Sequence, residues 1–286
     1  MKKAVIDIGT NTFHLLIAEI LNQTDVEIIH KKTIAVKLGE GGVNKGFIAD
    51  AAYERGINAL IEFRKDLDQH QIKNIKATAT AAVRDASNGA EFIKDALAKA
   101  DIRIEIIDGL KEAEYIYKGA KSARVLSANT SLVMDIGGGS VEFIICNQQL
   151  IFWKKSFRLG AARLLADFYF EDPISKTTVS KIHQFFAQTL TDLFEAVQIY
   201  QPTELIGTAG SFDSYAEMNS IQNNFIFDAN IQNRYDYKEV EFNNLLENII
   251  ASTHQQRLKW KDNSIKGGYD FNGKYSYAVY SSSNKN

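Results

Sequence analysis

Three short segments of this chain carry residues whose types and spacing could bind phosphate. Residues 7–12 read Asp-Ile-Gly-Thr-Asn-Thr, residues 135–140 read Asp-Ile-Gly-Gly-Gly-Ser, and residues 207–211 read Gly-Thr-Ala-Gly-Ser. Because these turns have little side-chain bulk, their backbone N–H groups and hydroxyls can approach an anion closely. The predicted phosphate-binding residues of the three turns are Gly9, Thr10, Asn11, Thr12, Gly137, Gly138, Gly139, Ser140, Gly207 and Thr208.

Asp7 and Asp135 each stand at the end of a predicted buried strand, where an unpaired charge is costly. Carboxylates are ligands for hard cations, so two such turns facing each other across a cleft could grip a phosphate chain, with both aspartates holding a hydrated Mg²⁺. The alternative is that each turn is a tight hairpin whose aspartate hydrogen-bonds its own backbone.

The first two segments belong to a longer internal repeat. Residues 4–17 align without a gap on residues 132–145, and each copy has an apolar strand, the turn and a second apolar strand. The second strand carries one polar side chain in the same register, His14 or Glu142. The duplication predicts two similar domains, residues 1–124 and 125–286.

Alternating and helical periods predict the elements that would position these turns. In the first half, we expect strands at 3–8, 13–20, 25–33, 72–78 and 102–107 and helices at 51–69, 90–100 and 111–123. In the second half, after the repeated hairpin, we expect strands at 149–157 and 204–206 and helices from about 161, at 175–200 and at about 238–258. This order predicts an α/β fold with sites at strand ends and turns.

Composition narrows the class of protein. The 286 residues include 33 basic and 35 acidic side chains, a net charge of −2, which disfavours a surface built for nucleic acid or for an anionic membrane. Cys146 is the one cysteine, which fits a reducing cytoplasm, and no apolar run approaches the ~20 residues that span a bilayer. We therefore expect a cytoplasmic protein without a nucleic-acid or membrane partner.

Further motifs extend the pattern along residues 1 to about 258. They are Leu38-Gly39-Glu40-Gly41, Ala77-Thr78-Ala79, Arg84-Asp85-Ala86, Gly109 with Glu112-Ala113, Leu159-Gly160-Ala161 and Arg163-Leu164. Together with the three turns, this ordered set resembles the exopolyphosphatase/guanosine-pentaphosphate phosphohydrolase (Ppx/GppA) family. The resemblance implies two ribonuclease-H-like domains of the actin, sugar-kinase and heat-shock-chaperone superfamily around a cleft, in a short two-domain form.

The resemblance also implies residue roles. Glu112, which on sequence alone would be a solvated helix charge, becomes the catalytic carboxylate that orients or deprotonates a water. Arg84 is a candidate phosphate clamp, and Lys37 falls where the family often has a substrate-facing arginine. Glu142 either orients the nucleophile or holds metal through water, or else is a satisfied structural carboxylate; His14 is expected to support its hairpin. Lys111 stands where the family usually has an acidic residue.

The implied activity is Mg²⁺-dependent release of terminal orthophosphate from polyphosphate or guanosine pentaphosphate, and the sequence does not separate these two substrates. Alternatives are a non-catalytic polyphosphate or alarmone sensor and a small-molecule kinase of the same superfamily. A homodimer is the default expectation for an oligomer. A basic stripe along a long anionic substrate is a further hypothesis, with candidates Lys31, Lys32, Lys37, Lys154, Lys155, Arg158 and Arg163.

The last segment, residues 259–286, differs from the rest of the chain. It is rich in Lys, Asn, Ser, Gly and Tyr without a helical or alternating period, so we expect it to lie outside the core and to be poorly ordered. A reading shifted by one nucleotide permits an apolar helical string with family resemblance. We therefore hypothesise an out-of-frame tail, a hypothesis that the coding DNA tests directly.

Overall fold

The computed structural model of the chain describes residues 1–22, 26–168, 170–223, 227, 234–265 and 277–281. The chain forms two compact units. Unit 1 contains residues 1–112, 137–140 and 158–167, and unit 2 contains residues 113–136, 141–157 and 168–286. The tip of the second repeated hairpin therefore counts with unit 1, although its strands belong to unit 2.

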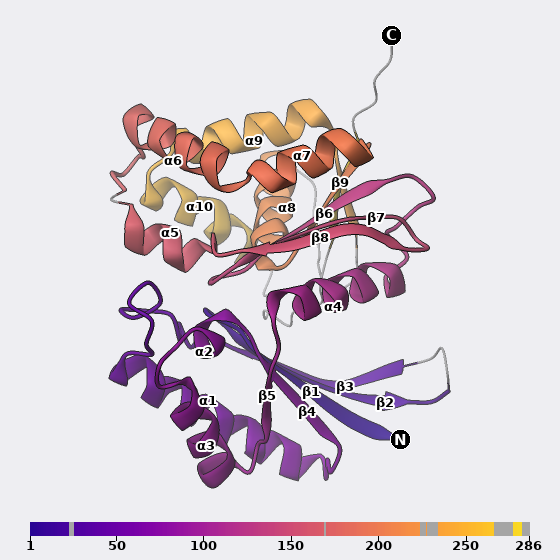
Figure 1. Cartoon of the computed structure of the whole chain (residues 1–286), viewed down its shortest axis with the longest axis vertical. Helices are drawn as coiled ribbons and strands as arrows, with labels where there is room; N and C mark the ends of the chain where they lie inside the picture. Colours follow the sequence, from indigo (N-terminus) through magenta and orange to yellow (C-terminus); the bar gives the residue numbers. More distant parts are fainter. Residues whose placement is uncertain (23–25, 169, 224–226, 228–233, 266–276, 282–286) are drawn as a thin grey trace. The chain divides into compact units, whose positions relative to one another are not determined.

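Unit 1 is built on a five-stranded mixed sheet. Its strands are β1 (Lys2–Ile8), β2 (Phe13–Ile20), β3 (Val26–Ile34), β4 (Ile75–Ala79) and β5 (Ile104–Ile106). The order is β3-β2-β1-β4-β5, antiparallel from β3 to β1 and parallel from β1 to β5 (Figure 1). This is the ribonuclease-H-like arrangement that the sequence predicted.

Two helices, α1 (Asp50–Gln69) and α3 (Gly89–Ala100), cover one face of this sheet. The alternation of β1 sends Ala4, Ile6 and Ile8 into the core with these helices and sends Asp7 to the opposite face. The largest helix side chains of this core are Leu60, Phe63, Leu67 and Phe92. One further turn of helix, α2 (Ala81–Arg84), follows β4 and leads into Asp85.

Unit 2 repeats the arrangement around a six-stranded sheet. Its strands are β6 (Ser131–Ile136), β7 (Val141–Cys146), β8 (Ile151–Phe157), β9 (Glu204–Thr208), β10 (Arg234–Tyr237) and β11 (Tyr277–Ser281). The order is β10-β11-β9-β6-β7-β8, in which β8, β7, β6 and β9 correspond to β3, β2, β1 and β4 of the first sheet. The two-domain α/β class predicted from the internal repeat is thereby confirmed.

Helices cover both faces of the second sheet. On one face, α4 (Gly109–Ser122) packs through Ala113, Tyr117 and Ala120 against Val133 and Ile144. On the other, α8 (Gly210–Gln222) and α9 (Glu239–Ala251) bury an aromatic-rich core. That core contains Phe212, Ala216, Phe227, Tyr235, Tyr237 and Leu245, with Met134 and Ile136 packed against it.

The boundary between the two compact units falls after Glu112, because α4 packs on the second sheet. The sequence placed the domain boundary later, after residue 124. Residues from Ala113 onward share a core with the second sheet, whereas the sequence assigned all residues to 124 to the first domain. The sequence shows α4 as an amphipathic helix but not which sheet receives its apolar face, because both sheets offer an apolar surface at that point of the chain.

Two long predicted helices are each divided. Residues 175–200 form α6 (Lys176–Thr189) and α7 (Thr191–Tyr200), and the last segment forms α9 and α10 (His254–Ile265). At the first break, the hydroxyls of Thr189 and Thr191 donate to the carbonyls of Phe185 and Gln188. Such local hydrogen bonds compete with the helical pattern and can separate two helices without a proline or glycine. Unit 1 also gains α5 (Ala161–Asp167), as expected from residue 161 onward.

The tail departs from the sequence prediction. Helix α10 continues past residue 259 to Ile265, and β11 lies between β10 and β9 in the second sheet. Residues 277–280 read Tyr-Ala-Val-Tyr, which have the β-branched and aromatic character that favours strands. This segment therefore contains regular elements although its sequence shows no helical or alternating period. Residues 266–276 and 282–286 lie outside the described residues, and the reading-frame hypothesis stays a prediction about the DNA.

No helix among the described residues is long and apolar enough to cross a membrane.

The third predicted turn contains one glycine that packing explains. A Cβ added to Gly207 would lie 2.0 Å from Cδ1 of Phe212, inside the ring that anchors α8 in the core of unit 2. A Cβ added to Gly210 would meet no atom within 4 Å. The packing of Phe212 therefore requires glycine at position 207, independently of any role of Gly207 in phosphate binding.

We predict that Gly207→Ala lowers the free energy of unfolding by about 1–3 kcal/mol, because the added methyl group overpacks the core. Gly210→Ala, in the same turn, should change it by less than about 0.5 kcal/mol, since open space receives the methyl group. Urea denaturation of both variants checks this. Equal midpoints for the two alanine variants would contradict the assignment of Gly207 to packing.

Candidate active site

The first turn of the site is held by backbone hydrogen bonds. Gly9 donates its N–H to the carbonyl of Thr12 at 3.1 Å, which closes the β1–β2 hairpin. The carbonyl of Asn11 accepts from the N–H of Lys37 at 2.7 Å, and that of Thr10 accepts from Gly39 at 3.0 Å. The loop that carries Lys37 is therefore fastened directly to the first turn.

Lys37 takes an unusual backbone conformation in this loop. Its φ of 52° lies in the left-handed region, which is uncommon for a residue with a side chain. Arg55 of α1 braces the loop, since its Nε donates to the carbonyl of Val36 at 2.8 Å and its Nη2 contacts Glu40 at 2.6 Å. These contacts hold the backbone at Lys37 beside the turn.

The second turn repeats the first and packs against it within unit 1. Gly137 donates its N–H to the carbonyl of Ser140 at 3.0 Å, as Gly9 does to Thr12. A Cβ on Gly138 would lie 2.7 Å from Cγ of Asn11, and one on Gly139 would lie 2.5 Å from Oγ1 of Thr10. The structure thus brings the two predicted turns together, so closely that only glycine fits at the contact.

A buried arginine ties these turns to the rest of unit 1. Arg163 is 4% exposed and donates from Nε to the carbonyl of Gly139 at 2.7 Å and from Nη1 to the carbonyl of Val43 at 2.8 Å. Its Nη2 pairs with Asp85 Oδ2 at 2.6 Å. The inclusion of Arg163 in a surface stripe is wrong, because its guanidinium is buried and donates hydrogen bonds to three separate segments of the chain.

Arg84 and Glu112 lie together at the end of α2 and the start of α4. Arg84 Nη1 is 3.7 Å from Glu112 Oε2 and donates to the carbonyl of Ile107 at 3.2 Å. Asp108 fixes the beginning of α4, since its side chain accepts from the N–H of Lys111 at 2.7 Å. A guanidinium that can fork onto phosphate oxygens therefore stands beside a carboxylate that can accept a proton.

In unit 2 a row of polar side chains crosses the sheet. Asp135 on β6 pairs in register with Glu142 on β7 and with Thr208 on β9, and Glu142 pairs with Ser156 on β8. Thr208 donates its hydroxyl to Asp135 Oδ2 at 2.5 Å, and Ser156 donates to Glu142 Oε1 at 2.6 Å. Burial raises the pKa of Asp135, and the hydrogen bond from Thr208 opposes that shift. Two carboxylates therefore share one face of adjacent strands.

Unit 1 contains the corresponding row. Asp7 on β1 pairs in register with His14 on β2 and with Thr78 on β4, and His14 pairs with Thr33 on β3. His14 Nδ1 lies 3.1 Å from Thr33 Oγ1, and burial lowers the pKa of the imidazole. This contact agrees with the supporting role expected of His14. Where unit 2 has a second carboxylate, unit 1 has a histidine.

These donors fit a hydrated Mg²⁺ better than a metal enclosed by protein. Among the described residues, no three His, Cys, Asp or Glu side chains are grouped to hold a metal ion. Mg²⁺ keeps several waters and commonly takes one or two carboxylates together with substrate phosphates. Asp135 and Glu142 supply two such carboxylates, and the predicted sharing of one cation by Asp7 and Asp135 stays a prediction.

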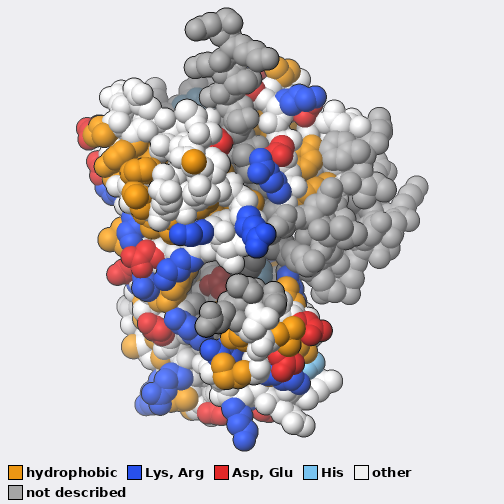
Figure 2. Space-filling model, turned by 90° about the vertical axis from the view of Figure 1, so that its right-hand side faces the viewer, with side chains coloured by type: hydrophobic (Ala, Val, Ile, Leu, Met, Phe, Trp, Pro, Cys, Tyr) orange, Lys and Arg blue, Asp and Glu red, His pale blue; other side chains and the backbone are white. Residues whose placement is uncertain are grey.

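The predicted basic stripe is mostly neutralised. Lys32 pairs with Glu62 and Asp66, Lys154 pairs with Glu114, and Lys155 pairs with Asp192. On the face drawn in Figure 2, Lys and Arg side chains are interspersed with acidic and hydrophobic ones. Of the stripe candidates, Lys37 and Arg158 remain the exposed cations next to the two turns.

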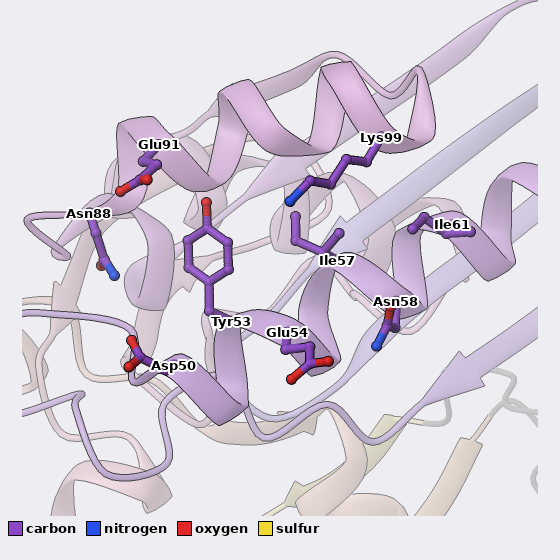
Figure 3. Close-up of a pocket in the computed structure, with 9 residues that line it drawn as sticks. All are labelled: Asp50, Tyr53, Glu54, Ile57, Asn58, Ile61, Asn88, Glu91 and Lys99. Atoms are coloured by element: carbon purple, nitrogen blue, oxygen red, sulfur yellow. The ribbon is translucent and has the colours of Figure 1, made fainter.

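A separate pocket lies between α1 and α3 (Figure 3). Its volume is about 420 Å³, and Tyr53 rises from α1 toward α3 beside Glu91. The pocket is lined by Asp50, Tyr53, Glu54, Ile57, Asn58, Ile61, Asn88, Glu91 and Lys99. Because this lining includes none of the predicted site residues and carries three acidic side chains against one basic one, the pocket is unsuited to a phosphate chain.

Sequence reasoning missed the roles of two residues in this arrangement: Asp85 and Ser156. Asp85 lay within a quoted motif, but nothing in the sequence identifies it as the counter-ion of a residue 78 positions later. Ser156 had a detectable signal, because it is a polar residue in the strand that follows the second hairpin. Predicting that Ser156 lies opposite Glu142 would have required knowledge of the hairpin length and of the irregular register between Ile145 and Cys146.

Comparison with known proteins places the chain in a family. Residues 16–264 match the model of the Ppx/GppA phosphatase family. A crystal structure of an exopolyphosphatase from Cytophaga hutchinsonii is 36% identical, with a TM-score of 0.88 over 98% of this chain and 94% of the other. Exopolyphosphatase 2 of Mycobacterium tuberculosis is 27% identical over 89% of this chain and 81% of its own length.

Two other relatives are longer than this chain. The bifunctional 3-dehydroquinate synthase/phosphatase of Fusobacterium nucleatum is 33% identical over 91% of this chain, which spans 40% of that protein. A putative exopolyphosphatase of Haemophilus influenzae is 28% identical over 75% of this chain and 66% of its own length.

The two sheets, which share the ribonuclease-H-like strand order, thus define the two-domain α/β class that the sequence indicated. The chain belongs to the Ppx/GppA phosphatase family.

The buried Arg163 generates a stability prediction. Arg163→Met should lower the free energy of unfolding by about 3–5 kcal/mol, because it leaves Asp85 and two carbonyls without their buried donor. Arg103→Met, at an exposed position of the same unit, should leave it nearly unchanged. Guanidinium denaturation measures both, and a small loss for the Arg163 variant would show that the turns do not depend on this guanidinium.

The row in unit 2 generates a prediction for Mg²⁺ and pH. Because the folded-state pKa of Asp135 lies above its ordinary value of 3.8, the folded protein retains this proton to higher pH. The free energy of unfolding therefore falls as the pH rises from 3.8 to the higher pKa that Asp135 has in the folded protein. In EDTA, Asp135→Asn should melt above the wild type at pH 7, and the difference should vanish below about pH 3.8.

The same variant should lose the rise in melting temperature that Mg²⁺ gives the wild type, since an amide is a poorer ligand for a hard cation. Asp236→Asn, at an exposed carboxylate of unit 2, is the control and should retain that rise. Thermal melts across a Mg²⁺ titration test this. Identical titrations for wild type and Asp135→Asn would show that the aspartate is only a turn residue.

Proposed function

We propose that this chain is a Mg²⁺-dependent phosphoanhydride hydrolase that releases terminal orthophosphate from inorganic polyphosphate, guanosine pentaphosphate or both. Relatives named exopolyphosphatase support a polyphosphate substrate, and a guanosine-5'-triphosphate,3'-diphosphate pyrophosphatase 32% identical over 60% of this chain supports the nucleotide. The single observation that carries the proposal is the contact between the turns at 9–12 and 137–140.

The turns bind the phosphate chain through backbone groups. Residues 9–12 and 137–140 each form a closed hairpin turn with small side chains, so a phosphate can come within hydrogen-bond distance of main-chain N–H groups. The hydroxyls of Thr12 and Ser140 add donors. The third turn precedes the N-terminus of α8, a 13-residue helix whose first N–H groups and dipole favour an anion.

Glu112 and Arg84 supply the reactive pair. A phosphoanhydride is cleaved when a water attacks phosphorus in line with the leaving oxygen, and little covalent chemistry is required of the protein. Glu112 orients this water and accepts its proton. Arg84, 3.7 Å from Glu112, holds phosphate oxygens and stabilises the charge on them.

Mg²⁺, when bound, neutralises charge on the phosphate oxygens and orients them. Asp135 and Glu142 are the residues that would hold it, with waters and substrate oxygens as the remaining ligands. Thr208 and Ser156 keep the two carboxylates in place by donating to them. This use of neutral hydroxyl donors leaves the carboxylate charges available to a cation.

Replacing Glu112 with Gln tests the proposal. We expect kcat for orthophosphate release to fall about 10²–10⁴-fold, because the amide cannot accept the proton, while binding of the phosphate chain persists. Glu114→Gln is the matched control, since Glu114 lies two residues along the same helix and pairs with Lys154. The assay follows orthophosphate from long polyphosphate, guanosine pentaphosphate and ATP, with Mg²⁺ or EDTA.

The outcomes separate the alternatives. Unchanged turnover by the Glu112 variant would refute the role of this carboxylate. Tight binding of polyphosphate by the wild type without release of orthophosphate would instead favour a non-catalytic sensor. Phosphate transfer from ATP to an added acceptor would favour a kinase.

A further inference from the structure

Three arginines converge on one carboxylate in unit 1. Asp85 Oδ2 lies 2.6 Å from Arg163 Nη2 and 3.3 Å from Arg158 Nε, and its Oδ1 lies 3.3 Å from Arg84 Nε. Glu112 lies 3.7 Å from Arg84, and Asp167 acts electrostatically on Arg163. No acidic group besides Asp85 is paired with Arg158 in the described part of the chain.

The three guanidinium groups differ in how many N–H donors remain available to a ligand. Arg163 is buried and fully used by backbone carbonyls and Asp85. Arg84 is about four-fifths buried and is tied to Ile107 and Glu112. Arg158 has a side chain 66% exposed, and within the described part of the chain its ion pair is made through Nε. A guanidinium has five N–H donors, so the Nη edge of Arg158 can still meet a ligand.

The backbone after Arg158 is fixed against the second turn. Ala161 and Ala162 donate their N–H groups to the carbonyls of Gly137 and Gly138 at 3.0 and 2.9 Å. A Cβ on Gly160 would lie 2.3 Å from the carbonyl carbon of Gly138. Arg158 is therefore held near the phosphate-binding turn by its own chain and by Asp85, which limits the arrangements of its long side chain.

We propose that Arg158 binds a second phosphate group of the substrate, adjacent to the one that reacts, and so selects anhydride chains over orthophosphate. This rests on the proposed function and names a specificity-determining residue for the same site. Arg84 and Arg158 contact different oxygens of Asp85, so a phosphate group held by Arg84 leaves Arg158 to a neighbouring phosphate group of the same chain. Asp85 is the positioning residue, because it holds Nε and leaves the Nη edge of the guanidinium toward the ligand.

The experiment measures binding apart from turnover. Calorimetry gives the dissociation constants of a non-hydrolysable imido-linked triphosphate and of orthophosphate for wild type, Arg158→Ala, Arg158→Lys and Arg103→Ala. We expect Arg158→Ala to weaken triphosphate binding about tenfold and orthophosphate binding less than twofold. Arg158→Lys should recover part of the loss, since it restores the charge without the fork. Arg103→Ala should match the wild type.

Equal weakening for both ligands, or none for the triphosphate, would overturn the proposal and leave Arg158 as a structural partner of Asp85. Full recovery of triphosphate binding by Arg158→Lys would show that the charge alone is sufficient. It would overturn the proposed two-point contact of the guanidinium with phosphate oxygens. A melting temperature close to that of the wild type verifies that Arg158→Ala is folded. Because binding is measured without hydrolysis, the two proposals can fail separately. A wild type that binds the imido-linked triphosphate but releases no orthophosphate from polyphosphate or guanosine pentaphosphate would refute the proposed function and still test this inference.

Discussion

The contact between the turns at 9–12 and 137–140 is the constraint on which the site depends. It packs the glycine backbone of the second turn against side chains of the first, and a single Cβ on Gly138 or Gly139 would overlap Asn11 or Thr10. Arg163 then links the second turn to the loop at Val43 and to Asp85, so one buried guanidinium fixes three segments. The site therefore rests on close packing and on satisfied carbonyls more than on the exposed charges that first draw attention in the sequence.

The internal duplication explains the site and its asymmetry. Both sheets carry an aspartate at the end of the central strand, with a threonine on one neighbouring strand and a polar side chain on the other. The two copies have diverged at that last position, to His14 in unit 1 and Glu142 in unit 2. Burial lowers the pKa of the imidazole beside Asp7, whereas Asp135 has a second carboxylate beside it, so the row of unit 2 contains more acidic groups than that of unit 1.

The basic side chains differ in how they are paired with carboxylates. Lysines that looked like parts of a stripe are matched with carboxylates on neighbouring elements, which leaves less of their charge for an anionic substrate. The arginines near Asp85 are different, because three of them share one acidic partner. Asp85 therefore fixes the positions of two partly exposed guanidinium groups, those of Arg84 and Arg158, relative to each other.

The sequence by itself determined the repeat, the mixed α/β class, most strands and helices of unit 1, and the residues of the turns, because strand alternation and glycine-rich turns are local properties. It did not determine which sheet receives α4, where long helices break, or that residues 277–281 form a strand. Only the tertiary structure decided that Arg163 is buried, that Asp85 is its partner and that Ser156 supports Glu142. These are pairings between residues far apart in the chain, and a charge count or a local period carries no information about which partner each side chain meets.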